Sequence, residues 1–139
     1  KREGYRRAFH QFDIARVAGM EDDELTALLH DSGIIRNRQK IWAVRANARA
    51  ALAVKEQQNL VDYLWRHVDG RPVQNSWRSA ADVPSMTDAS ERMSRDLKRH
   101  HFKFVGPTTC YAFMQSSGMV NDHLVDCYRY EEVQNAERD

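Results

Sequence analysis

The chain contains a short run of residue types that favour an anion-binding helix start: Gly106, Pro107, Thr108 and Thr109. Proline suits the first turn of a helix, because its missing N–H removes no intrahelical hydrogen bond. The other N–H groups of that turn lack intrahelical acceptors and lie at the positive end of the helix dipole. Just before them, Phe102 and Phe104 alternate with Lys103, which predicts two rings turned into a core and one ammonium turned outward. The segment can therefore hold one nucleic-acid phosphate, with an ordinary helix–loop–helix corner as the alternative.

A histidine and a cysteine four residues apart, His123 and Cys127, form a second candidate site. On a helix they share one face, so both could reach the same metal ion. Zinc accepts nitrogen and sulfur ligands in a tetrahedral set, and it would need two further ligands. From spacing alone, a buried cysteine beside a capping histidine is the alternative.

Two further residues could carry chemistry. Asp122 directly precedes His123. From its position it could brace His123 or cap a helix. Cys110 follows the two threonines and has no histidine within one helical turn. It is therefore expected to be a core thiol, not a nucleophile.

These residues must be positioned by helices, because apolar residues recur at helical spacing along most of the chain. We expect helices over residues 22–30, 38–55, 59 or 60 to 67, 88–100, 107–117 and 123–127. Residues 70–87 contain two of the three prolines and are typical of a long connection. The helix after it opens with Asp88 and Glu91 at the spacing of a capping box, and Thr87 could also cap it. No alternating strand pattern extends beyond the loop at 101–106, so the predicted fold is all-α.

Length and composition indicate one modest globular domain. The chain has 139 residues, of which 42% are hydrophobic and 29% charged. No apolar run approaches the roughly 20 residues that a membrane span needs. Two cysteines are too few for a disulfide framework, which favours a reducing, intracellular compartment.

The distribution of charge is more informative than the formal net charge of +1. No carboxylate lies between Asp31 and Glu56, whereas that segment carries six basic residues: Arg36, Arg38, Lys40, Arg45, Arg49 and Lys55. A segregated basic face fits contact with phosphates, and a solvated helix surface is the alternative.

These motifs resemble, in order, those of the DNA-3-methyladenine glycosylase I family, within the helix-hairpin-helix superfamily of DNA repair glycosylases. The similar segments span nearly the whole chain: Tyr5 to Asp13, Gly33 to Ile41, Asn47 to Ala50, Phe102 to Gly106, Phe113 to Gln115, Gly118, and Val120 to Cys127. The resemblance implies a single helical glycosylase-like domain over 1–139, with a hairpin at 98–109 and a zinc-clip segment at 120–128. It also implies that roughly fifty residues precede Lys1.

The activity implied by the resemblance is hydrolysis of the N-glycosidic bond of 3-methyladenine in double-stranded DNA, as part of base excision repair. No lyase activity is expected, because the lysine that would carry it is missing from the hairpin, where Tyr111 or a neighbour stands. The hairpin would hold DNA through Lys103, Gly106, Thr108 and Thr109, with Arg36 adding attraction. The protein is expected to be a monomer in the bacterial cytoplasm, near the nucleoid. A non-catalytic DNA-binding module and a plain helical scaffold are the alternatives.

The resemblance also assigns roles to individual residues. Tyr111, Ala112 and Phe113 would face the base pocket, with core packing as the alternative and favoured for Phe113. The glutamate that recognises the base would lie upstream of Lys1. Related members of the superfamily have a catalytic aspartate soon after the hairpin helix, which makes Asp122 a candidate catalytic residue. This family lacks a counterpart of that aspartate, which favours bracing of His123 or capping of a helix for Asp122. His123 and Cys127 would bind a structural zinc ion with two ligands near the N-terminus. Glycine is usual in the family where His101 stands, and a turn that needs a positive φ accepts histidine less readily, so the chain departs from the family pattern at this point of the hairpin.

Overall fold

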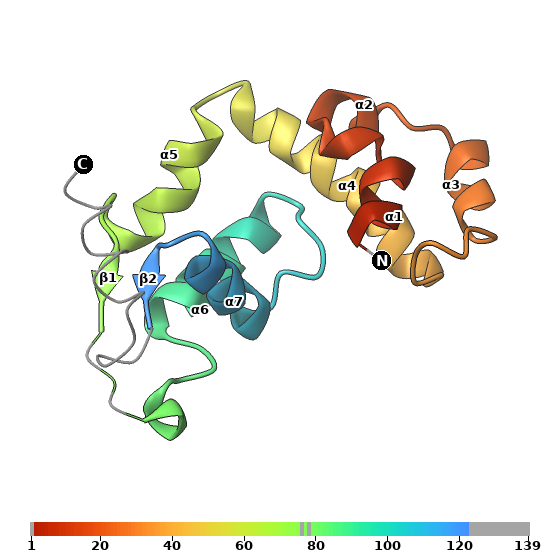
Figure 1. The fold of residues 1–139 in the computed structure, drawn as a ribbon. Helices are drawn as coiled ribbons and strands as arrows, with labels where there is room; N and C mark the ends of the chain where they lie inside the picture. The colour runs from red at the N-terminus through yellow and green to blue at the C-terminus, as the bar shows by residue number, and fades with distance from the viewer. Residues whose placement is uncertain (1, 76, 78, 123–139) are drawn as a thin grey trace. The chain divides into compact units, whose positions relative to one another are not determined.

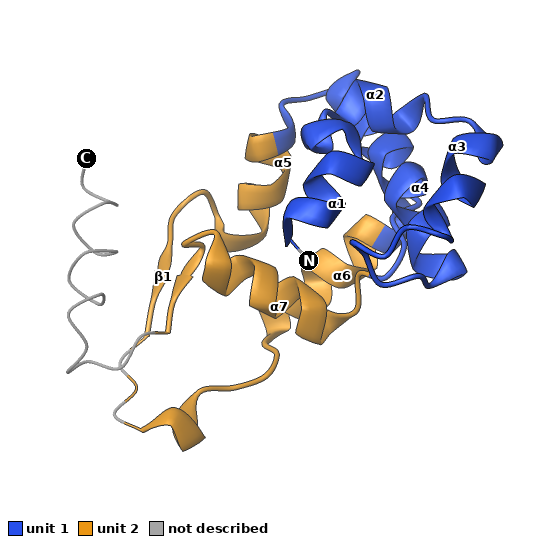
Figure 2. Ribbon diagram, turned by 45° about the vertical axis from the view of Figure 1, so that its right-hand side comes forward, with its two compact units in different colours: residues 1–60, 98–104 blue, residues 61–97, 105–139 orange. Residues whose placement is uncertain are grey.

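The computed structural model describes residues 2–75, 77 and 79–122, and in them the chain is predominantly helical (Figure 1). The all-α prediction is confirmed. The chain forms two compact units, coloured separately in Figure 2. Unit 1 comprises residues 1–60 with 98–104, and unit 2 comprises 61–97 with 105–139. Among the described residues, no helix is both long enough and apolar enough to cross a membrane.

Unit 1 is built around one long helix. Its elements are α1 (Arg2–Ala8), the 3₁₀ turn η1 (His10–Phe12), α2 (Ile14–Ala18), α3 (Asp22–Leu28) and α4 (Arg38–Lys55). The bounds of α4 are those predicted from the sequence. Asn37 caps this helix, since its Oδ1 accepts a hydrogen bond from the Lys40 N–H at 3.1 Å.

Each helix around α4 contributes at least one apolar side chain to the core of unit 1. Phe9, Leu25 and Ile41 are almost completely buried, and Met20 and Ile34 lie in the same cluster. The inner face of α4 is largely alanine, which lets α2 approach it closely. Small residues on a long helix thus provide the flat surface on which the shorter helices pack.

A contact between two backbone segments fixes the start of unit 1. A Cβ atom on Gly4 would lie only 1.9 Å from the Gly33 carbonyl oxygen, so α1 can approach the segment before α4 only with glycine there. The next residue strengthens this contact, because the Tyr5 hydroxyl accepts a hydrogen bond from the Ile35 N–H at 3.0 Å.

The turn η1 was not predicted. His10, Gln11 and Phe12 have φ values of 54°, 60° and 58°, a left-handed conformation that non-glycine residues seldom adopt. Side-chain contacts hold it: His10 Nε2 lies 2.6 Å from Glu24 Oε2, and the Phe9 and Phe12 rings stack with centroids 6.5 Å apart.

Unit 2 contains α5 (Leu60–Trp65), the 3₁₀ turns η2 (Arg66–Val68) and η3 (Ala80–Asp82), α6 (Asp88–Arg99), α7 (Pro107–Ser116) and two short strands. Strand β1 (Val73–Gln74) pairs in parallel with β2 (Val120–Asn121), with Val73 opposite Val120. Two-residue strands leave no alternating pattern in a sequence, so this pair, of which only β1 lies within the predicted connection 70–87, was missed.

Of the two caps expected for α6, the structure shows Thr87 and not the box of Asp88 with Glu91. Thr87 and Ser90 bond reciprocally: the Ser90 N–H donates to Thr87 Oγ1 at 3.3 Å, and the Thr87 N–H donates to Ser90 Oγ at 2.9 Å. The spacing is that of a capping box moved back by one residue. Asp88 and Glu91 instead place negative charge in the first turn, where it favours the helix dipole.

Candidate functional site

Helix α7 begins at the Gly-Pro-Thr-Thr segment as predicted. Gly106 is its N-cap, with φ −64° and ψ 166°, and Pro107 occupies the first turn. The first helical hydrogen bond runs from the Cys110 N–H to the Gly106 carbonyl at 2.9 Å. Among the described residues, the N–H groups of Thr108 and Thr109 have no acceptor, and both threonines are exposed. Two amides at the positive end of a helix dipole are thus open to an anion.

The loop before α7 departs from the expected arrangement in one respect. Lys103 is exposed, as predicted, and Phe102 is half-buried, but the Phe104 ring is 53% exposed. The prediction that both rings enter a core is therefore wrong for Phe104. The reason is the backbone: Phe104 has φ 58°, which breaks the strict alternation that the prediction assumed. His101 has φ 75°, so this histidine adopts the left-handed conformation for which glycine is usual in the family.

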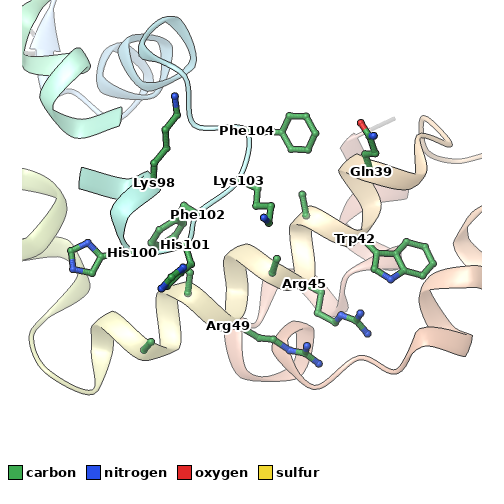
Figure 3. Close-up of a pocket in the computed structure, with 14 residues that line it drawn as sticks. Gln39, Trp42, Arg45, Arg49, Lys98, His100, His101, Phe102, Lys103 and Phe104 are labelled. Atoms are coloured by element: carbon green, nitrogen blue, oxygen red, sulfur yellow. The ribbon is translucent and has the colours of Figure 1, made fainter. Parts of the chain in front are cut away.

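Within unit 1, this loop and α4 enclose an open groove of about 790 Å³ (Figure 3). Lys98 at the end of α6, with Lys103 and Phe104 of the loop, lines one side. Helix α4 contributes Trp42, Arg45 and Arg49 to the other. No carboxylate is among the lining residues. The groove therefore combines aromatic and alanine surface with positive charge.

Some of the basic residues of 31–56 serve the fold rather than the surface. Arg45 donates to the Met20 carbonyl at 3.1 Å and to Asp22 Oδ1 at 2.7 Å. Arg49 donates to the Ala18 carbonyl at 2.8 Å, so both satisfy carbonyls at the end of α2. The Arg38 guanidinium lies 4.2 Å from the centre of the Trp42 ring. Arg36 and Lys40 are exposed, and their proposed attraction to DNA stays a prediction.

Asp122 is the centre of a hydrogen-bond network within unit 2. Its Oδ1 accepts from Asn75 Nδ2 and, at 2.8 Å, from Trp77 Nε1. Its Oδ2 accepts from the Tyr111 hydroxyl and, at 3.2 Å, from Gln115 Nε2. Two carboxylate oxygens offer about four lone-pair positions, and these four donors use all of them. The network joins the segment after β1 to α7 and to the end of β2.

Tyr111, Ala112 and Phe113 do not share one environment. Tyr111 is 1% exposed, whereas Phe113 is 42% exposed and Ala112 is also exposed. Successive residues on a helix point about 100° apart, so three in a row cannot line one pocket equally. Core packing, which was favoured for Phe113, is therefore wrong for that ring. Burial raises the pKa of Tyr111, and its hydrogen bond to Asp122 and the carboxylate's charge raise it further.

The predicted metal ligands His123 and Cys127, with the predicted helix 123–127, lie outside the described residues. Within the described part of the chain, no three side chains of the metal-binding types come together. Cys110 is 3% exposed, and its Sγ donates to the Val105 carbonyl at 3.4 Å, so the expected core thiol is confirmed.

Sequence reasoning missed several residues that shape these sites: Asn47, Asn75, Trp77, Ser94 and Gln115. Asn47 bonds to the main chain of Lys103, and the hydroxyl of Ser94 donates to the Val105 carbonyl at 2.6 Å. The partners of these residues are 7 to 56 residues away in sequence, and no local pattern reports such pairs. The one available signal was polar residues at inward positions of helices, namely Asn47 in α4 and Ser94 in α6.

Comparison with known proteins finds the same family by sequence model and by individual relatives. Residues 1–130 match the family model described as methyladenine glycosylase. DNA-3-methyladenine glycosylase 1 of Escherichia coli K12 is 45% identical over 131 residues, which cover 94% of this chain and 70% of that protein. DNA-3-methyladenine glycosylase of Haemophilus influenzae is 45% identical over 128 residues, covering 91% and 69%.

Solved structures agree with the sequence matches. A crystal structure of 3-methyladenine DNA glycosylase I superposes with a TM-score of 0.88 at 45% identity, covering 91% of this chain and 70% of that one. The Staphylococcus aureus enzyme, in a structure that describes its recognition of 3-methyladenine, gives a TM-score of 0.87 at 31% identity. This superposition covers 91% of this chain and 68% of that one.

Proposed function

Because the chain belongs to the methyladenine glycosylase family, we propose that it is a DNA repair glycosylase that releases 3-methyladenine from alkylated DNA. The match of residues 1–130 to the family, with 45% identity to enzymes of that name, is the observation that carries this function. Relatives of the same fold are described as binding 3-methyladenine.

The reaction is a hydrolysis. Methylation at N3 leaves a positive charge on the base, so the bond from the base to C1′ of the sugar is already weakened. Water forms the new bond to C1′, the base leaves as neutral 3-methyladenine, and one proton is released. The target nucleotide must leave the base stack for water to reach C1′, and the protein supplies the surface that holds the flanking strand.

The proposed grip on DNA is the start of α7. The open N–H groups of Thr108 and Thr109 would bind one phosphate, and Lys103 would add an exposed positive charge. Contacts to phosphates carry no base sequence, which suits an enzyme that must act on a lesion in any sequence context. Arg36 and Lys40 would add screened, longer-range attraction.

We also propose that Asp122 braces unit 2 and does not activate water. Its four donors occupy the lone pairs that a general base needs for a water molecule. We propose double-stranded DNA as the partner of a monomer, and a cytoplasmic location, because the substrate is there.

Zinc binding by His123 and Cys127 is a separate proposal that rests on their spacing of four residues. It is tested by elemental analysis of the purified protein beside a Cys127→Ser variant. Zinc bound by the parent and lost from the variant supports it, and metal-free parent protein removes it.

The activity is tested with the full chain and duplex DNA treated with a methylating agent. Free 3-methyladenine, measured by chromatography, is expected to appear, and no strand should break at the abasic site because lyase activity is absent. The alternative, a non-catalytic DNA-binding module, would retain the duplex and release no base. Loss of binding in Gly106→Pro and Lys103→Glu supports the proposed grip, and unchanged binding removes it.

A further inference from the structure

Asn47 makes two hydrogen bonds to the main chain of one residue in the loop before α7. Its Oδ1 accepts from the Lys103 N–H at 2.6 Å, and its Nδ2 donates to the Lys103 carbonyl at 3.0 Å. Both residues belong to unit 1. One side-chain amide thus pairs with the loop as a neighbouring strand would, using its donor and its acceptor together.

Asn47 occupies a position that helix propensity alone would not favour. It lies in the middle of α4, where asparagine is less favourable than alanine, and most of its neighbours are alanine. It is half-buried, so its amide must find partners within the protein. The helix therefore bears a local cost, and the two bonds to Lys103 offset it.

The loop needs an external support. His101 and Phe104, on either side of Lys103, have φ values of 75° and 58°. Non-glycine residues keep such values only where the surroundings hold them. Lys103 and Phe104 are exposed, so their side chains supply little packing to hold the turn. Two residues, Phe102 and Lys103, lie between these strained positions, and only Lys103 is exposed. The amide of Asn47 bonds to the main chain of this exposed residue.

We propose that Asn47 is a positioning residue for DNA binding, which holds Lys103 and its loop in the conformation that meets the phosphate backbone. This inference rests on the proposed function. The hydrogen bond from Asn47 Nδ2 also holds the partly negative carbonyl oxygen of Lys103 toward α4 and satisfies it there. The ammonium group of the same residue remains available to a phosphate.

The effect should appear in substrate binding and not in the chemical step. A contact to the flanking strand is made equally in the ground state and the transition state, so its loss raises KM and leaves kcat unchanged. Alanine at position 47 also has a higher helix propensity, so α4 should remain folded. A merely structural residue would instead lower the thermal unfolding midpoint and reduce the active fraction.

The test compares Asn47→Ala with the parent chain on methylated duplex DNA, with Gln57→Ala as the matched control. Gln57 is an exposed amide just beyond α4, away from the loop. We expect KM to rise about tenfold in Asn47→Ala, as for the loss of two ordinary hydrogen bonds, with kcat within about twofold. Gln57→Ala should match the parent chain.

Hydrogen–deuterium exchange in peptides covering 98–104 provides the second readout, and it should accelerate in Asn47→Ala while α4 remains protected. Faster exchange with an unchanged KM would overturn the inference, and so would a fall in kcat accompanied by a lower unfolding midpoint. A parent chain that binds DNA but releases no base would overturn the proposed function alone. The DNA affinities of the parent chain and of Asn47→Ala, measured by binding isotherms, would then still decide the role of Asn47.

Discussion

The Asp122 carboxylate accepts hydrogen bonds from two other segments of unit 2, so it should contribute to the stability of that unit. Replacing it with asparagine keeps its size but turns an NH₂ group toward two of these donors. We expect Asp122→Asn to reduce the free energy of unfolding by about 3 kcal/mol, the scale for breaking a partly buried charged network.

Urea unfolding measures this change, and Asp69→Asn is the control. Asp69 is exposed and has φ 54°, a conformation that asparagine tolerates equally well. A purely catalytic Asp122 would give the opposite pattern, with full stability and lost activity.

Tyr111 gives a pH-dependent signature of the same network. Its pKa is raised, so at alkaline pH the folded chain keeps a proton that the unfolded chain has lost. The contribution of Tyr111 to stability is complete below about pH 10, the ordinary tyrosine value, and declines as the pH rises above it.

In an absorbance titration at a wavelength that reports tyrosinate, Tyr111→Phe should remove amplitude only from the most alkaline part of the curve. Loss of amplitude near pH 10 in this variant would show that the network does not shift the pKa of Tyr111.

At the scale of elements, α6 depends on a cap that lies outside it in sequence. Thr87→Ala removes the oxygen that accepts from the Ser90 N–H, and we expect a loss of about 1 kcal/mol in unfolding free energy. Thr87→Ser keeps that oxygen and should stay close to the parent chain. Thermal unfolding compares the two, and equal destabilisation would point to the lost methyl group and not to the cap.

The helices were predictable because their signals are local. The bounds of α4 followed from its alanine-rich amphipathic pattern, and the start of α7 followed from Pro107. For α6 the sequence left two caps open, Thr87 and Asp88, since threonine and aspartate both offer capping oxygens, and the structure selects Thr87. The left-handed turn at 10–12 had no signal at all, because it contains no glycine and is held by contacts such as that of His10 with Glu24.

The candidate sites were only partly predictable for a related reason. Residue types identified the open amides after Gly106 and the exposed Lys103, which depend on local backbone. The partners of Asp122 and of Lys103 come from segments up to 56 residues away, and only the folded chain brings them together. The prediction that the Phe104 ring enters a core was wrong, because the positive φ of Phe104 breaks the alternation of side-chain directions that the sequence indicates.

For the whole molecule, binding to DNA should depend on salt through the number of phosphates that the protein neutralises. If Lys103 contacts one phosphate, Lys103→Gln should reduce the slope of log K against log salt by about one. Arg16→Gln removes an exposed charge outside the loop and the groove, and it should leave the slope unchanged. Binding isotherms at several salt concentrations measure both, and equal slopes for all three chains would exclude Lys103 from the interface.

Cys110 lies where the small electrophiles that create methylated bases cannot easily reach it. The residue is 3% exposed, and its Sγ donates to the Val105 carbonyl of the turn that leads into α7. Thiolates in contact with solvent are the nucleophiles that such reagents modify first, and a buried, bonded thiol reacts slowly. At this position, the fold thus shields the repair machinery from the very agents whose damage it removes.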